Sequence, residues 1–224
     1  MEDGKQMNNL NVLYEDNHII VVEKPYNVLS QSDITGDNDM LSMVKEYIKV
    51  KYNKPGNVYL GLVHRLDRPV GGIMVFARTS KAASRLMKQF QEHSITKKYL
   101  AICNGKVDKE GEFVDYLEKL SNGNSIVSSN GKKARLLYKC LQYNESDDLS
   151  LVEIDLKTGR HHQIRVQFSS RGHALYGDQK YNKNSKLGQQ IALFSNNITF
   201  YHPIVKEKIN FELPLPNIKP WNLF

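Results

Sequence analysis

Apolar runs separated by polar turns cover most of the chain and predict both strands and helices. Residues 11–25 contain two apolar runs that meet at a polar pair, a pattern typical of a β-hairpin. Residues 39–52 carry apolar side chains at helical spacing, and 71–76 form a short apolar run that predicts a buried strand. Thr79 or Ser80 is then placed to cap a second helix.

The second half of the chain is richer in strand signals. Segments 97–107 and 131–143 predict strands. Along 149–160 the residues that would face opposite sides of a strand differ in polarity, which predicts a half-buried strand that ends in a Thr-Gly turn. Segment 161–172 fits a helix with a glycine just past its end, and 191–216 predicts two further strands. The pattern therefore indicates a mixed α+β fold with a mainly antiparallel sheet.

Length and composition set the class of protein. The 224 residues show no repeat or linker, so we expect an N-terminal tail over 1–9 and one domain over 10–224. Lys and Arg number 31 against 24 Asp and Glu, a net charge of +7 that favours a polyanionic partner. The two cysteines, Cys103 and Cys140, lack metal or redox spacing, and no apolar stretch has membrane-spanning length. We expect a soluble, cytoplasmic monomer.

Two polar clusters are the candidates for chemistry. Residues 64–68 read HRLDR, and residues 158–165 read TGRHHQIR. Neither has the spacing of zinc-binding histidines, and the chain lacks a phosphate loop, a dinucleotide fingerprint, kinase motifs and a G-x-S-x-G nucleophile elbow. The sequence therefore argues against metal, kinase, nucleotide-cofactor and serine-hydrolase chemistry.

Asp67 is the unusual residue of the first cluster, because it lies in an apolar passage between Arg65 and Arg68. Positive neighbours favour the ionised form of a carboxylate. An ionised carboxylate in a restricted site can act as a nucleophile at a sugar carbon. The alternative is a buried Asp–Arg ion pair that joins two strands. Either cluster taken alone favours this structural alternative, because ion-pair networks are common.

Six motifs, in family order from about residue 10 to 216, resemble those of the RluA-type pseudouridine synthases. They read EKPYNVLSQ, HRLDRPVGG, KKYLAICNG, TGRHHQIRVQF, LYGDQKY and FYHPIVKEKINFELPLP. Six ordered motifs are very unlikely by chance, so the chain is identified as a member of this family. The resemblance implies the pseudouridine synthase fold, with a mainly antiparallel mixed sheet, flanking helices and a central RNA-binding cleft.

The resemblance also implies roles for individual residues. Asp67 matches the catalytic aspartate, and Tyr99 matches the tyrosine that packs against the uracil face. Arg165 matches the arginine that forms a salt bridge with the catalytic aspartate. Arg65 matches the arginine that can wedge into RNA where the target uridine leaves the stack. The structural alternatives are core filling for Tyr99, surface charge for Arg165 and a plain phosphate contact for Arg65.

The remaining residues of the motifs have less specific interpretations. We expect three to shape the catalytic loop: His64, Leu66 and Gly72. Three more could touch RNA, but bracing of the segment 158–165 is favoured: His161, His162 and Gln163. Two arginines are candidate phosphate contacts on composition alone, with a solvated surface role equally open: Arg68 and Arg160.

Three positions depart from the family pattern. Gly71 stands in place of serine, and Leu193–Ser195 replaces the usual L-H-A. Asn27 replaces a glycine, and asparagine is one of the few residues that tolerate positive φ, so the turn can survive. Larger relatives carry an N-terminal S4-type RNA-binding domain. Only about ten residues precede the first predicted strand, so we expect the catalytic domain alone.

The implied reaction is the isomerisation of uridine to pseudouridine in ribosomal RNA, transfer RNA or both. It involves no redox change and no external group, so no cofactor and no metal are expected. Two alternatives stay open. One is a catalytically inert RNA-binding module on the same scaffold. The other is a hydrolase or lyase that uses His64 and Asp67.

Overall fold

The computed structural model describes residues 10–224, which form two compact units. Unit 1 comprises the chain up to Glu92 together with Tyr201–Glu207, and unit 2 comprises His93–Phe200 and Lys208–Phe224. The predicted tail, residues 1–9, lies outside the described residues. The predicted boundaries of a single catalytic domain stay a prediction.

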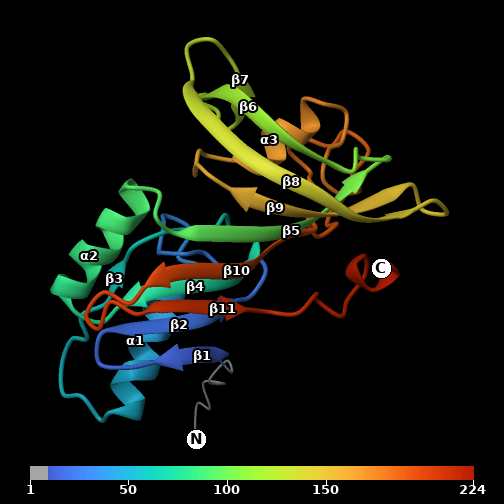
Figure 1. Ribbon diagram of the computed structural model, residues 1–224. Coiled ribbons are helices and arrows are strands. Elements are labelled where there is room, and N and C mark those ends of the chain that lie inside the picture. Colours follow the sequence, from blue (N-terminus) through green and yellow to red (C-terminus); the bar gives the residue numbers. More distant parts are fainter. Residues whose placement is uncertain (1–9) are drawn as a thin grey trace, which may run out of the picture. The chain divides into compact units, whose positions relative to one another are not determined.

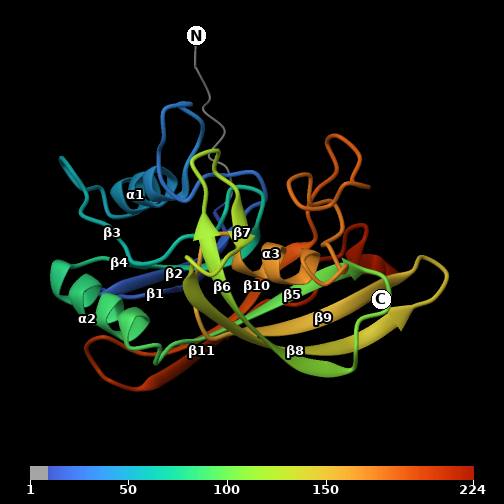
Figure 2. The ribbon, with the colours of Figure 1, turned by 90° about the horizontal axis from the view of Figure 1, so that it is seen from above.

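Unit 1 is built on a small antiparallel sheet in the order β1-β2-β4, with β3 paired to one end of β4. Helix α1 lies beside this sheet in both views (Figures 1 and 2). The elements are β1 (Val12–Glu15), β2 (Ile19–Lys24), α1 (Met40–Lys51), β3 (Gly61–Leu62), β4 (Gly71–Ala77) and α2 (Ser80–Gln91).

Local sequence explains these elements. Strands β2 and β4 consist almost entirely of buried residues, and they pair in register from Ile19–Ala77 to Lys24–Gly72. Both helices begin at a side-chain cap: Asp39 accepts a hydrogen bond from the Ser42 main chain, and Thr79 from that of Ala82. The predicted hairpin, helices and buried strand of this region are confirmed.

Unit 2 is an antiparallel sheet in the order β10-β5-β9-β8-β6-β7, with β11 paired to β10. Helix α3 lies next to β6 and β7 (Figure 2). The elements are β5 (Thr96–Asn104), β6 (Glu110–Lys119), β7 (Ser125–Val127), β8 (Lys132–Asn144), β9 (Leu149–Leu156), α3 (Gln163–Ser169), β10 (Leu193–Tyr201), β11 (Lys208–Glu212) and the 3₁₀ turn η1 (Trp221–Leu223).

One face of the unit 2 sheet is apolar and carries α3. Tyr99, Ile154 and Tyr138 lie side by side on β5, β9 and β8. Phe168 of α3 packs edge-on against Tyr138 at 5.6 Å and against Phe113 at 5.0 Å between ring centroids. Tyr99 and the helix that bears the second polar cluster are therefore on the same face of this sheet.

The predicted strands and helix of this half are confirmed, but β6 and β7 were not predicted. Burial alternates along β6, but apolar residues lie on both faces: Phe113 and Leu117 are buried, while Val114 and Tyr116 are exposed. The sequence therefore lacks the alternation of polar and apolar residues that predicts a strand. Cross-strand pairing with β8 stabilises a segment whose own pattern is weak. The α+β class and the mainly antiparallel pairing are confirmed.

Candidate functional site

Asp67 lies in unit 1, in the loop 63–70 between β3 and β4, and is half-buried. The Ser30 hydroxyl donates to the Leu66 carbonyl at 2.7 Å and accepts from the Leu66 N–H at 3.0 Å. After Asp67, the Val70 N–H donates to the Asp67 carbonyl at 3.0 Å and closes a turn. The main chain is thus fixed on both sides of the carboxylate.

Lys24 supports the same loop from within the core. Its side chain is fully buried, and Nζ donates to the carbonyls of Pro25 at 3.0 Å, Arg68 at 2.9 Å and Val70 at 2.7 Å. Burial lowers the pKa of Lys24 to about 7, while the negative charge of Asp67 acts in the opposite direction. The ammonium form has three N–H donors, one for each carbonyl.

His64 and Gly72 shape the loop, as predicted. The Val75 N–H donates to His64 Nε2 at 2.9 Å, and the His64 ring stacks on Phe90 with centroids 5.0 Å apart. Gly72 has φ +116°, a conformation that glycine adopts without strain. His64 is therefore occupied in holding the loop against β4 and α2.

Two departures from the family pattern have a structural explanation. Asn27 has φ +63°, so asparagine keeps the left-handed turn that glycine would make. A Cβ at Gly71 would lie 3.1 Å from the Tyr26 ring and 3.3 Å from the Lys24 carbonyl, so the tyrosine occupies the space that a serine would use. Nothing in the structure explains the change at Leu193–Ser195.

The two candidate RNA-binding arginines of this loop are both exposed. Arg68 forms an ion pair with Asp37, Nη1 to Oδ2 at 2.9 Å, and its Nε donates to the Asn27 carbonyl at 3.3 Å. Both side chains of this pair are 46% exposed, so the pair is weak and can exchange partners. Arg65 comes two residues before Asp67 in the same loop.

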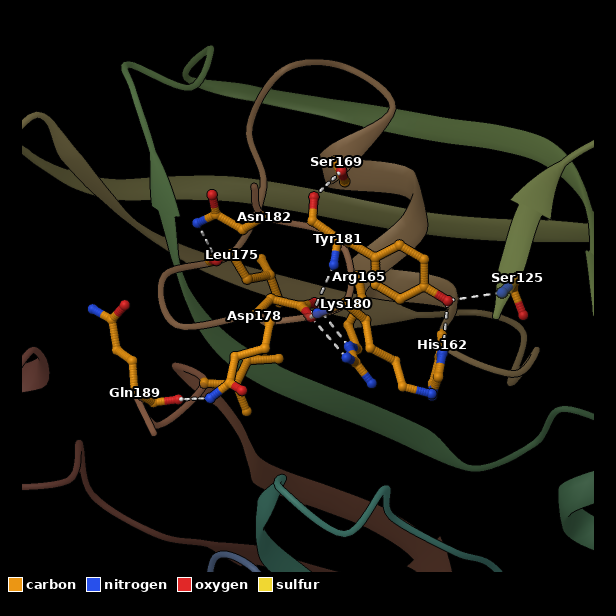
Figure 3. Close-up of polar contacts among 12 residues, drawn as sticks. Ser125, His162, Arg165, Ser169, Leu175, Asp178, Lys180, Tyr181, Asn182 and Gln189 are labelled. Atoms are coloured by element: carbon orange, nitrogen blue, oxygen red, sulfur yellow. Dashed lines mark hydrogen bonds and ion pairs between the residues drawn. The ribbon is translucent and has the colours of Figure 1, made fainter. Parts of the chain in front are cut away.

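Arg165 lies in α3 of unit 2 and forms a buried two-pronged ion pair with Asp178 (Figure 3). Its Nε and Nη2 donate to Oδ2 at 2.8 Å and to Oδ1 at 2.7 Å. The side chains are only 6% and 0% exposed. The Tyr181 ring lies 5.1 Å from the guanidinium, and the Tyr181 and Lys180 N–H groups also donate to Asp178.

Asp178 is thus a partner of Arg165 that the sequence interpretation missed. The resemblance implied Asp67 as the partner, but Asp67 belongs to unit 1, so that ion pair stays a prediction. A signal for Asp178 was present, because it is the aspartate of the LYGDQKY motif. Lys24 was also missed by the sequence interpretation. Its signal is that a lysine ends the apolar run IIVVEK.

The segment 158–163 is braced through Gln163, as predicted. Gln163 Oε1 accepts from the Thr158 hydroxyl at 2.7 Å and from the Arg160 N–H at 3.0 Å, while its Nε2 donates to the Arg135 carbonyl at 3.1 Å. Arg160 Nε donates to the Lys133 carbonyl at 2.9 Å. The turn before α3 is therefore a rigid structure.

The two histidines of this segment also make structural contacts. His161 Nδ1 lies 2.9 Å from the Ser125 hydroxyl. His162 Nδ1 lies 2.7 Å from the Tyr181 hydroxyl (Figure 3). The Tyr181 hydroxyl also accepts from the Ser125 N–H at 2.7 Å. These bonds tie the start of α3 to β7 and to the 178–181 turn.

Within residues 10–224, no three His, Cys, Asp or Glu side chains gather as a metal ligand set. In the same range, no helix is both long and apolar enough to cross a membrane. The structure brings Tyr99 and Arg165 to one face of the unit 2 sheet, and it fixes Asp67 on a rigid turn of unit 1.

Comparison with known proteins gives the family. The family model described as RNA pseudouridylate synthase matches residues 18–170. The uncharacterized RNA pseudouridine synthase YhcT of Bacillus subtilis is 35% identical over 211 residues, which cover 92% of this chain and 69% of the relative. The ribosomal large subunit pseudouridine synthase D of Zymomonas mobilis is 33% identical over 222 residues, with the same two coverages.

Two solved structures share the fold. Human RNA pseudouridylate synthase domain containing 4 has a TM-score of 0.76, with 92% of this chain and 89% of that chain covered. Human RNA pseudouridylate synthase domain containing 1 has a TM-score of 0.75, with coverages of 96% and 86%. Both are 23% identical to this chain, and they confirm the predicted fold.

Proposed function

The chain belongs to the RNA pseudouridylate synthase family, and we propose that it isomerises uridine to pseudouridine with Asp67 as the catalytic carboxylate. Family membership makes it an isomerase that acts on RNA. The proposal adds three things: the roles of Asp67, Tyr99 and Arg165, the RNA substrate, and the position modified.

The reaction leaves the composition of the uridine unchanged. The bond between ribose C1′ and uracil N1 breaks, the uracil turns in its pocket, and a new bond joins C1′ to C5. The proton on C5 leaves, and N1 gains a proton. Asp67 assists the first step, either by attack on the sugar, by attack on the base or by removal of a sugar proton. No step calls for a cofactor, and we expect none.

The uridine must leave its helix before Asp67 can reach it. We assign Arg65 to the gap that the uridine leaves, because a cationic side chain there lowers the cost of unstacking. Tyr99 provides an aromatic face against which the free base can stack. Arg68 and Arg160 contact phosphates, and Arg68 exchanges Asp37 for a phosphate when RNA binds.

The observation that supports this proposal most is the way the Asp67 loop is held. Ser30 fixes the residue before Asp67, and Lys24 fixes the carbonyls of the residues after it. All of these bonds go to the main chain. A carboxylate kept at a constant position by its backbone suits chemistry that depends on orientation.

Ribosomal RNA is the first substrate to test, because relatives at 33% and 31% identity carry the name ribosomal large subunit pseudouridine synthase D. Transfer RNA is the second. We further propose that residues 10–224 act as one catalytic domain, as a monomer in the cytoplasm and without a metal.

The direct test is tritium release from RNA transcribed with uridine tritiated at C5. Isomerisation releases tritium and leaves pseudouridine in the RNA strand. Binding without tritium release would identify an inert RNA-binding module, and release of free uracil would identify a hydrolase or lyase. Pseudouridine mapping by carbodiimide-stop sequencing in a deletion strain would then give the RNA and the position.

A further inference from the structure

The segment 178–190 of unit 2 forms a closed loop, here called the lysine loop. Its two ends meet, because a Cβ at Gly177 would lie only 2.1 Å from the Gln190 carbonyl oxygen. Gln179 Nε2 donates to the Gln189 carbonyl at 3.2 Å and joins the two sides of the loop. A loop with neighbouring ends that is held by its own side chains is an Ω-loop, a class that often carries function.

The start of the lysine loop is anchored to the buried ion pair of Arg165. Asp178 Oδ1 accepts from Arg165 at 2.7 Å and from the Lys180 N–H at 3.0 Å (Figure 3). The Asn182 N–H donates to the Asp178 carbonyl at 2.8 Å, and Asn182 Nδ2 donates to the Leu175 carbonyl at 3.0 Å. Because Asp178 and Asn182 are both buried, these bonds fix the loop relative to α3.

The tip of the lysine loop is a turn that holds one leucine in solvent. The Gln189 N–H donates to the Lys186 carbonyl at 3.1 Å, and Gln189 Oε1 accepts from the Lys186 N–H at 3.0 Å. Gly188 has φ +79°, as the third residue of a type II turn requires. Leu187, at the second position of this turn, is 97% exposed. It therefore contributes nothing to the apolar core.

The exposed charges of the lysine loop are all positive. Lys180, Lys183 and Lys186 are exposed, and the segment 179–192 contains neither Asp nor Glu. None of the three lysines forms an ion pair with a residue of the range 10–224, although Lys180 Nζ donates to the Gly123 carbonyl at 3.3 Å. Positive charge beside an apolar tip suits an RNA strand, which offers both phosphates and the faces of unstacked bases.

We propose that the lysine loop is a further RNA contact of this protein, in which Lys183 and Lys186 bind phosphates and Leu187 packs against a base. The inference rests on the proposed function. The turn at the tip is already formed, so little conformational freedom is lost when a base covers the leucine. Since Asp178 holds both the loop and Arg165, RNA on the loop has a constant position relative to α3.

The first test is the salt dependence of RNA binding, measured with a fluorescein-labelled RNA hairpin whose single-stranded loop consists of uridines. Lys183→Gln/Lys186→Gln is compared with Lys109→Gln/Lys139→Gln, which removes the same charge from exposed positions before β6 and on β8. We expect the loop variant to reduce the slope of log Kd against log salt by about 1.4, which is about 0.7 for each phosphate contact on a single strand. The control should keep the wild-type slope, because counterions are released only where phosphates are bound.

The second test removes the apolar tip and leaves every charge in place. We expect Leu187→Ser to bind the same RNA about fivefold more weakly, since it loses the apolar surface that a base would cover. The slope against salt should stay that of the wild type. Leu141→Ser is the matched control, because Leu141 is a 47% exposed leucine of β8, and it should bind like the wild type.

Thermal melting shows whether each variant is folded, as we expect for changes of exposed side chains. A wild-type slope in folded Lys183→Gln/Lys186→Gln would overturn the proposal, and so would an equal loss of slope in Lys109→Gln/Lys139→Gln. The assignment of Leu187 would be wrong if Leu187→Ser bound no more weakly than Leu141→Ser.

Turnover separates this inference from the proposed function. If the wild type releases no tritium from any RNA, the proposed function fails, whereas the binding slopes still test the lysine loop. If the wild type turns over and Lys183→Gln/Lys186→Gln keeps both its slope and its KM, the inference alone fails. A higher KM at nearly unchanged kcat is the expected result, because these contacts are made equally in the ground state and the transition state.

Discussion

Asp67 and Arg165 are held in opposite ways. Around Asp67, the supporting groups bond to the main chain: Ser30 to Leu66, and Lys24 to the carbonyls of Arg68 and Val70. Arg165 is held by its own side chain, through two hydrogen bonds to the buried Asp178 and a contact with the Tyr181 ring.

Because of this difference, we expect a substitution of Asp67 to lower activity with little loss of stability, and a substitution of Arg165 to lower stability. The hydrogen bonds from Ser30 and Lys24 to this loop end on main-chain atoms, so a change of the Asp67 side chain leaves their acceptors and donors in place. A change of Arg165 leaves the buried Asp178 carboxylate without its cationic partner. This loss lowers the free energy of unfolding, whatever Arg165 does in the reaction.

The largest expected effect is on the activity of Asp67→Asn. This change keeps the size of the side chain and removes its charge, so we expect turnover to fall at least about 10³-fold. Single-turnover tritium release measures this rate, and urea unfolding should give wild-type stability. A variant that unfolds far more easily yet turns over normally per folded molecule would make Asp67 a structural residue.

The second effect is on the stability of Arg165→Met. Breaking the pair with Asp178 should cost about 3–5 kcal/mol of unfolding free energy, a fall in Tm of roughly 10 °C for a chain of this size. Arg135→Met is the control, because the Arg135–Glu112 pair is half-exposed and should cost at most about 1 kcal/mol.

A double variant sharpens this test. Arg165→Met with Asp178→Leu removes both charges, so it should recover much of the lost stability. If activity stays low in the stable double variant, Arg165 also acts in catalysis. If Arg165→Met proves as stable as the wild type, the contrast with Asp67 is wrong.

The third effect concerns Lys24 and pH. The pKa of Lys24 is about 7 in the folded chain and near 10.5 once unfolded. Between these values the unfolded chain binds more protons, so the unfolding free energy rises with pH, by at most about 1.4 kcal/mol per pH unit. Below pH 7 both states are protonated and this dependence vanishes.

Lys24→Met should therefore lose the rise in stability between pH 7 and pH 10, as measured by urea unfolding across that range. Lys49→Met, at an exposed position of α1, controls for the loss of one positive charge. Parallel pH curves for the wild type and Lys24→Met would show that the burial of Lys24 has no such consequence.

The smallest effect is expected for Gly71→Ser, which restores the residue of the family pattern. The new Cβ would press on the Tyr26 ring at 3.1 Å, so we expect a loss of about 1 kcal/mol. Turnover should stay within a few-fold of the wild type. Adding Tyr26→Leu should relieve the contact, and a double variant no more stable than Gly71→Ser would contradict this explanation.

The elements with a strong local pattern could be predicted from the sequence alone. Apolar spacing sets the buried strand at 71–77. The helix after it begins at Thr79, whose side chain accepts a hydrogen bond from the N–H three residues later. The motifs were likewise sufficient to identify the family, because the residues of each motif are adjacent in the chain.

The strand β6 and the partners of the site residues could not be predicted in this way. Arg165 and Asp178 are 13 residues apart, and Lys24 lies more than 40 residues from two of the three carbonyls it supports, those of Arg68 and Val70. Such contacts depend on which segments pack together, and a sequence pattern of short period carries no information about that choice.

The sequence by itself therefore determined the periodic elements, the turn residues and the chemical groups available at each motif, because these follow from local sterics and from side-chain type. Tertiary structure alone decided that Lys24 is an internal support and that Arg165 pairs with Asp178. The physical reason is that burial and charge pairing set the energy of a polar group, and both are properties of the packed chain.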